Sequence, residues 1–147
     1  MLGHLYENQD CSAARALELV GERWSLLILR DAMFRNSTRF SQFKASLGIA
    51  TNVLAKRLEA FVEAGLMERR PPRDASERPD YMLTRKGMDL KSVIIALTEW
   101  GDRWIGPGPV VFCTELGGER VSLELRTASH SKVAADSVVA RRRRKAR

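Results

Sequence analysis

The side chains best suited to recognition chemistry lie in one short stretch, residues 51–62. Thr51, Asn52 and Lys56 share one face of a helix. An asparagine amide can bond bidentately to adenine, and a lysine can approach guanine or phosphate. The pattern predicts a helix whose first residues enter the major groove of double-stranded DNA. A solvated surface helix is the alternative. The opposite face is apolar, at the spacing i, i+4, i+7 and i+8, through Leu54, Leu58, Phe61 and Val62.

Further polar and cationic side chains surround this stretch. Arg57 borders the apolar stripe, so a phosphate contact or an internal ion pair is expected of it rather than base recognition. Arg39, Ser41 and Gln42 stand at the start of the preceding helix. Because backbone N–H groups converge at such a helix start, we expect these three residues to bind phosphate.

Four arginines gather around a proline-bounded loop at residues 71–79. Strand-like segments at 66–70 and 81–84 flank the loop, which predicts a β-hairpin with an exposed tip. Guanidinium groups there could bind phosphates or reach into a minor groove, although Asp74, Glu77 and Asp80 dilute the charge. The four predicted DNA contacts are Arg69, Arg70, Arg73 and Arg78.

These residues need a scaffold of short helices. Apolar periodicity predicts helices over 12–20, 24–34 and 40–47, the last joined to the following helix by Gly48-Ile49-Ala50. Two helices joined by a short turn that contains glycine form a helix-turn-helix, and a β-hairpin directly after it forms a wing. The predicted fold class is mainly α with a small β-hairpin (α+β), a winged helix-turn-helix.

A long helix follows the hairpin, capped by Thr84 and running to about residue 104. Its apolar residues recur at spacings of 3, 4, 3 and 4, like the seam of a coiled coil. The seam could pack on its own domain, but two tryptophans near its end favour a homodimer through the terminal helices. The predicted dimerisation residues are Leu17, Leu90, Val93, Leu97, Trp100 and Trp104.

The character of the chain changes after residue 105. Gly106-Pro107-Gly108-Pro109 reads as a hinge, and the segments 110–114 and 120–125 resemble two strands joined around Gly117-Gly118. Residues 128–147 have few large apolar side chains and end in a run of Arg and Lys. The expected organisation is an N-terminal arm (1–10), a DNA-binding and dimerisation domain (11–104), a β-hairpin extension (105–127) and a flexible basic tail (128–147).

The net charge of +7 is unevenly distributed along the 147 residues. Residues 141–147 carry six of the 25 Lys and Arg side chains, and residues 35–86 carry 11 basic against 6 acidic ones. The segments 1–34 and 87–140 are each slightly acidic. A basic middle with acidic flanks is typical of a polyanion-binding face, with chance imbalance as the alternative.

Composition narrows the class of protein further. The sequence has no apolar run near the roughly 18–20 residues that span a membrane and no secretion signal at its start, so we expect a cytoplasmic protein without membrane contact. The two cysteines, Cys11 and Cys113, lie far apart without a CxxC motif, and with only His4 and His130 besides them the sequence shows no metal-ligand spacing. With no phosphate loop and no nucleophile beside a base, we expect neither a metal, nor a cofactor, nor an enzyme.

Cys11 is the candidate for redox chemistry. It directly precedes a helix, whose dipole can favour a thiolate, while the neighbouring Asp10 opposes this effect. A redox sensor and a structural thiol both remain open. Cys113 lies in a strand-like segment and is expected to be inert.

Several motifs occur in a fixed order between residues 11 and 104. They are Cys11, Ala14-Arg15-Ala16-Leu17, Gly21, Trp24-Ser25-Leu26-Leu27-Ile28-Leu29-Arg30, Arg39-Phe40-Ser41-Gln42-Phe43, Asn52-Val53-Leu54, Arg57-Leu58, Gly65-Leu66, Tyr81, Leu83-Thr84, Gly87 and Trp100-Gly101-Asp102-Arg103-Trp104. This order resembles the HxlR-type transcriptional regulators. The resemblance implies a bacterial or archaeal dimeric winged-helix protein that binds a pseudo-palindromic operator, and some relatives sense electrophiles or oxidants with a cysteine at the Cys11 position.

The chain departs from that family at the start of the recognition helix. Ala50 stands where the family usually has Ser or Thr, and we expect Thr51 to cap the helix instead by shifting its start one residue.

The sequence therefore favours a sequence-specific DNA-binding regulator, a repressor that acts as a homodimer and responds to a small-molecule or oxidant inducer. The alternative is a winged-helix module for protein interaction or RNA binding, without operator specificity.

Overall fold

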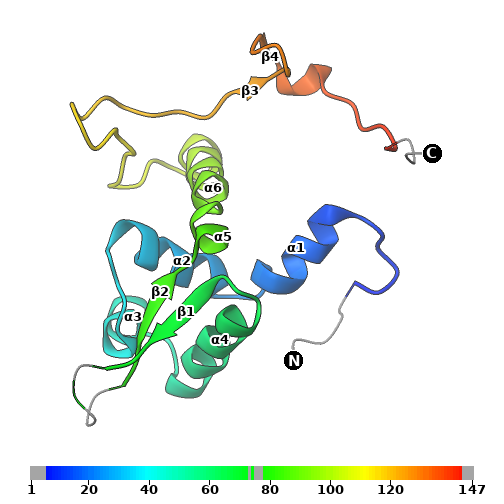
Figure 1. The fold of residues 1–147 in the computed structure, drawn as a ribbon. Helices are drawn as coiled ribbons and strands as arrows, with labels where there is room; N and C mark the ends of the chain where they lie inside the picture. Colours follow the sequence, from blue (N-terminus) through cyan, green and yellow to red (C-terminus); the bar gives the residue numbers. More distant parts are fainter. Residues whose placement is uncertain (1–5, 73, 75–77, 144–147) are drawn as a thin grey trace. The chain divides into compact units, whose positions relative to one another are not determined.

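A computed structural model describes residues 6–72, 74 and 78–143 of the chain (Figure 1). The chain divides into two compact units, residues 1–94 and 95–147. The first unit contains α1 (Ser12–Val20), α2 (Ser25–Phe34), α3 (Phe40–Leu47), α4 (Thr51–Glu63), β1 (Met67–Arg70), β2 (Asp80–Leu83) and α5 (Arg85–Met88). The helix α6 (Lys91–Trp104) spans the boundary, and the second unit adds β3 (Leu125–Arg126), β4 (Lys132–Val133) and the short 3₁₀ helix η1 (Ala135–Ser137).

The predicted helix-turn-helix is confirmed. Gly48 ends α3 with a left-handed φ of 61°, a conformation that favours glycine, and its N–H donates to the carbonyl of Lys44. Ile49 is buried, and α4 begins two residues later at Thr51. The turn thus sets α4 against α3 with its first residues exposed.

The predicted wing is also confirmed, because β1 and β2 pair antiparallel from Met67↔Leu83 to Arg70↔Asp80. The hairpin is tied to the helices by its backbone, since the N–H of Tyr81 donates to the carbonyl of Thr38 at 2.8 Å. Figure 1 shows α2, α3 and α4 gathered around this hairpin. The start of α3 and the base of the wing therefore lie together.

One apolar cluster holds the first unit together. The amphipathic spacing of α4 explains its part, because Leu54, Leu58 and Phe61 are all buried in the cluster. The other helices and the hairpin contribute residues at matching positions, among them Ile28, Leu29, Phe43, Met67 and Ile94. No helix among the described residues is both long and apolar enough to cross a membrane.

The expected continuous helix from Thr84 to Trp104 is wrong, because the structure breaks it into α5 and α6. Thr84 does cap α5, through Oγ1, which accepts the N–H of Gly87 at 3.1 Å. Gly87 lies so close to the carbonyl oxygen of Leu66 that a Cβ there would meet it at 2.1 Å. This close approach fixes α5 against the wing before α6 begins.

The second unit has little regular structure after α6. Cys113 and Arg120 form an isolated antiparallel bridge, within the two segments expected to be strands. Farther on, β3 pairs with β4 through Leu125↔Val133 and Arg126↔Lys132, and η1 follows. We call residues 105–143 the C-terminal arm.

Candidate DNA-binding interface

The leading end of α4 presents the polar residues predicted from the sequence. Thr51, Asn52 and Lys56 are all exposed, while Leu54 and Leu58 behind them are fully buried. The helix starts at Thr51 with Ala50 in the N-cap position, so the expectation that Thr51 replaces the missing cap is wrong. Thr51 is the first helical residue of α4 and is exposed.

Arg57 has a different environment from the other polar residues of α4. Its side chain is only 4% exposed, and its Nη2 lies 2.7 Å from Oε2 of Glu22. Of the two roles considered for Arg57, the internal ion pair is therefore the one found in the structure. We remove Arg57 from the candidate DNA contacts because its guanidinium group is buried.

A basic cavity of about 420 Å³ joins α3, α4 and the base of the wing. The guanidinium carbon of Arg78 lies 4.7 Å from the centroid of the Phe40 ring, which holds the wing over the start of α3. The cavity therefore brings together four predicted site residues and one cation that the sequence did not single out, Lys44. Its lining residues are Arg39, Phe40, Ser41, Lys44, Thr51 and Arg78.

Gln42 caps the start of α3 from within the helix. Its side-chain oxygen accepts the backbone N–H groups of Thr38 and Arg39, each at 2.9 Å. This oxygen is therefore occupied, and Gln42 shapes the loop before α3. Arg39 remains 61% exposed, with Nε 3.9 Å from Oδ1 of Asp80.

The wing arginines divide according to their partners. Arg69 binds Glu59 of α4, and this hydrogen bond and charge raise the pKa of Arg69 above its ordinary value. Nε of Arg70 lies 3.5 Å from Oε1 of Glu68, and both side chains are exposed. Arg73, also predicted as a contact, lies outside the described residues.

A buried carboxylate positions α3 from below. Asp31 is fully buried and accepts Nε and Nη2 of Arg30 at 2.9 and 2.7 Å. Its other oxygen accepts the hydroxyl of Ser46, near the end of α3, at 2.6 Å. This network was not predicted from the sequence, although an aspartate within an apolar helix was a signal for it.

Most of the predicted dimerisation residues are exposed on the isolated chain. On α6 the exposed fraction rises from 45% at Val93 to 53% at Leu97, 57% at Trp100 and 70% at Trp104. Leu17 on α1 is 47% exposed. Leu90 packs instead against the core cluster of its own unit, because it lies at the α5–α6 junction, and we remove it from the set.

The two cysteines are free and exposed. Cys11 is the N-cap of α1, where its sulfur accepts the N–H of Ala14 at 3.3 Å. Among the described residues, no group of three or more His, Cys, Asp and Glu side chains could hold a metal ion.

A helix-turn-helix with exposed polar residues on its second helix and a wing beside a basic cavity defines a winged-helix protein. The chain belongs to the HxlR-like helix-turn-helix family, which it matches over residues 19–109.

Two relatives illustrate the similarity. The chain is 47% identical over 104 residues to Rv3095 of Mycobacterium tuberculosis, named an uncharacterized HTH-type transcriptional regulator. This match covers 71% of the chain and 64% of Rv3095, so the chain spans less than two thirds of that relative. It is 31% identical to the HTH-type transcriptional regulator YodB of Bacillus subtilis, over 68% of this chain and 88% of YodB.

One solved structure extends the similarity beyond the region that the family model matches. The crystal structure of PA1607 matches with a TM-score of 0.82 and 36% identity, over 91% of this chain and 96% of PA1607. Reduced YodB matches with a TM-score of 0.55 and 27% identity, over 68% of this chain and 99% of YodB. The match with PA1607 therefore includes residues beyond those shared with YodB.

Proposed function

We propose that the protein is a transcriptional regulator that binds a specific double-stranded DNA sequence as a homodimer. The observation that carries this proposal is the juxtaposition of the exposed start of α4 with the basic cavity between α3 and the wing. The family and its named relatives, which are transcriptional regulators, agree with it. An arrangement of this kind can position a helix by phosphate contacts while its first turn reads bases.

The proposed contacts fall into two groups. Asn52 and Lys56 would meet base edges, because they are exposed on the helix that enters the groove, with Thr51 at its tip. Arg39, Ser41, Lys44 and Arg78 line the cavity, where three cations and the N-terminus of α3 favour a phosphate group. Arg70 would contribute a weaker phosphate contact from the wing.

The homodimer is supported by the exposed apolar face of α6. Large apolar side chains that recur along one helix face are unfavourable in water unless a partner covers them. Two copies related by a two-fold axis would present two α4 helices to half-sites about 34–36 Å apart, one helical turn of DNA. Binding over a promoter would make the protein a repressor that competes with polymerase.

A selection from random double-stranded DNA tests the proposal, because it can recover an operator of any sequence. We expect enrichment of a pseudo-palindromic sequence whose half-sites are one helical turn apart. A pool that remains random would contradict sequence-specific regulation. A separate titration that shows equally tight binding to unrelated RNA would favour a winged-helix module with another partner.

We also propose that Cys11 makes DNA binding responsive to thiol-reactive compounds. Cys11 is exposed, and the similar protein YodB has been solved in a quinone-bound form. Treatment with diamide or a quinone is expected to lower the DNA affinity of the wild-type protein and to leave the Cys11→Ser variant unchanged. Cys113→Ser is the matched control and should respond like the wild type. An unaltered response of Cys11→Ser would remove Cys11 from the mechanism.

A further inference from the structure

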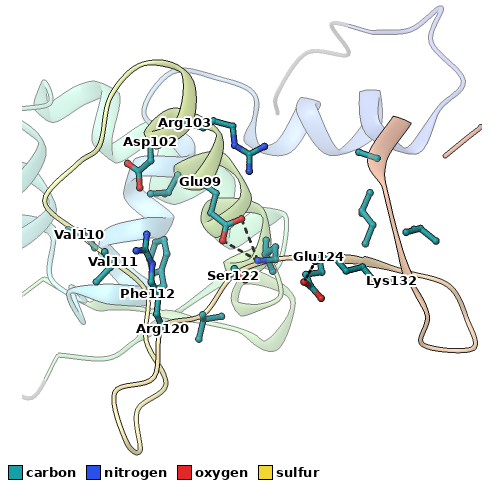
Figure 2. Close-up of a pocket in the computed structure, with 16 residues that line it drawn as sticks. Glu99, Asp102, Arg103, Val110, Val111, Phe112, Arg120, Ser122, Glu124 and Lys132 are labelled. Atoms are coloured by element: carbon teal, nitrogen blue, oxygen red, sulfur yellow. Dashed lines mark hydrogen bonds and ion pairs between the residues drawn. The ribbon is translucent and has the colours of Figure 1, made fainter. Parts of the chain in front are cut away.

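The second unit contains a groove that the proposed DNA contacts do not use. Residues of α6, including Glu99, Asp102 and Arg103, form one wall, and the C-terminal arm forms the rest (Figure 2). Its volume is about 880 Å³, which lies within the range of small-molecule sites. The family match ends at residue 109, so the arm falls almost entirely outside it.

The arm is fixed to α6 by hydrogen bonds to two carboxylates. The backbone N–H of Leu123 donates to Glu99 Oε1 at 3.1 Å, as the dashed lines of Figure 2 indicate. The N–H of Gly108 donates to Asp102 Oδ1 at 2.9 Å. Because the match with PA1607 covers 91% of this chain, most of the arm has a counterpart in a solved structure. These two hydrogen bonds therefore hold the arm beside α6, and the groove lies between α6 and the arm.

The charged side chains of the groove differ in whether they have a hydrogen-bond or ion-pair partner. Glu99 and Asp102 accept backbone N–H groups, and Glu124 binds Lys132 and Arg126. The hydrogen bond and charge of Lys132 hold the pKa of Glu124 below its ordinary value. Arg103 and Arg120 have no ion pair with any residue that the structure describes. The groove thus offers two uncompensated guanidinium groups and carboxylates that already have donors.

Apolar side chains provide the remaining lining of the groove. Val110, Val111 and Phe112 come from one segment of the arm, and Val121 comes from the segment that pairs with it. The N–H of Val121 donates to the carbonyl of Phe112 at 2.8 Å, so this part of the lining is held beside Arg120. In the view of Figure 2, Arg120 and Phe112 lie on the same side of the groove.

We propose that this groove binds a small organic anion with an apolar body, of the class of aromatic carboxylates. Arg120 binds the carboxylate, because charge-assisted bonds to a planar guanidinium group suit that anion. The apolar residues of the arm contact the ring, and Arg103 adds positive potential. A ligand held there bridges the arm and α6, whose exposed tryptophans belong to the proposed dimer face.

Calorimetric titration of the full-length protein with 2-naphthoate, in the absence of DNA, tests the site. We expect one naphthoate per chain, and at least tenfold weaker binding of the neutral 2-naphthamide. Arg120→Gln should weaken naphthoate binding at least tenfold. The matched control is Arg141→Gln, which removes the same charge from an exposed arginine of the arm that does not line the groove.

Three results would overturn the proposal: no binding of naphthoate, equal binding of the amide, or equal losses in both arginine variants. The first would be the outcome if a second copy of the chain filled the groove. Because the titration contains no DNA, its failure is distinct from a failure of the proposed regulatory function.

Discussion

Arg57 and Arg69 differ from Lys44 and Lys56 because each already binds a carboxylate of its own chain. Arg57 pairs with Glu22, and Arg69 pairs with Glu59. Binding a phosphate would require these pairs to be exchanged, whereas Lys56 and Lys44 are exposed on the surface of the interface. A carboxylate partner at short distance therefore makes a basic residue less available to DNA.

Asp31 shows how a single buried residue can position an interface that it does not reach. Asp31→Ala should lower the free energy of unfolding by about 3 kcal/mol, because it leaves Arg30 and Ser46 without their acceptor. Urea denaturation measures this loss. Asp89→Ala is the control, since Asp89 and its partner Arg85 are both exposed, and it should cost less than about 0.5 kcal/mol. Similar losses in the two variants would contradict a structural role for the Asp31 network.

At the scale of elements, the start of α4 lacks a side-chain cap. Ala50 occupies the N-cap position in an extended conformation, with φ of −61° and ψ of 139°. Ala50→Ser should therefore raise stability by about 1 kcal/mol, because a serine oxygen can accept an N–H of the first turn. Thermal unfolding measures the gain. Ala45→Ser, on the exposed surface of α3, should give no gain, since serine is a weaker helix former than alanine. Equal shifts in both variants would contradict the capping argument.

The helix-turn-helix and the wing could be predicted from the sequence because their local signals are strong. Leu54, Leu58 and Phe61 follow helical spacing, and Gly48 and Gly65 follow the two helices of the helix-turn-helix. The break between α5 and α6 could not be predicted. It lies just after Gly87, whose close approach to the Leu66 carbonyl joins segments distant in sequence.

The candidate site was predictable to a similar extent. The exposed residues of α4 followed from the amphipathic pattern. Lys44 was missed because it reaches the cavity only when the wing brings Arg78 over Phe40. The pairing of Arg57 with Glu22 also depends on tertiary packing, so the sequence left both of its roles open.

At the scale of the whole molecule, the exposed face of α6 determines how two copies could assemble. Trp100→Glu should convert a dimer to a monomer of 16.6 kDa, because it places a charge in the proposed apolar interface. Light scattering after size-exclusion chromatography measures the mass. Leu116→Glu is the control, since Leu116 is 90% exposed at the tip of a turn in the arm and lies outside the seam. A Trp100→Glu variant that remains dimeric would place the interface elsewhere.

The distribution of charge also acts at this scale. The basic residues 35–86 include the whole candidate interface, whereas residues 1–34 and 87–140 are slightly acidic. Such polarity would orient the protein toward DNA and make its affinity depend on salt.

The central claim is that α4 reads bases while the basic cavity binds phosphate. It is tested most directly by fluorescence anisotropy with the selected duplex and a scrambled one, at several salt concentrations. The wild type should bind the selected duplex at least about 10³-fold more tightly. Asn52→Ala should lose roughly 1–3 kcal/mol on the selected duplex alone, and Arg78→Ala should weaken both complexes and reduce the salt slope by about 1. Equal losses for Asn52→Ala on the two duplexes would contradict base reading by α4.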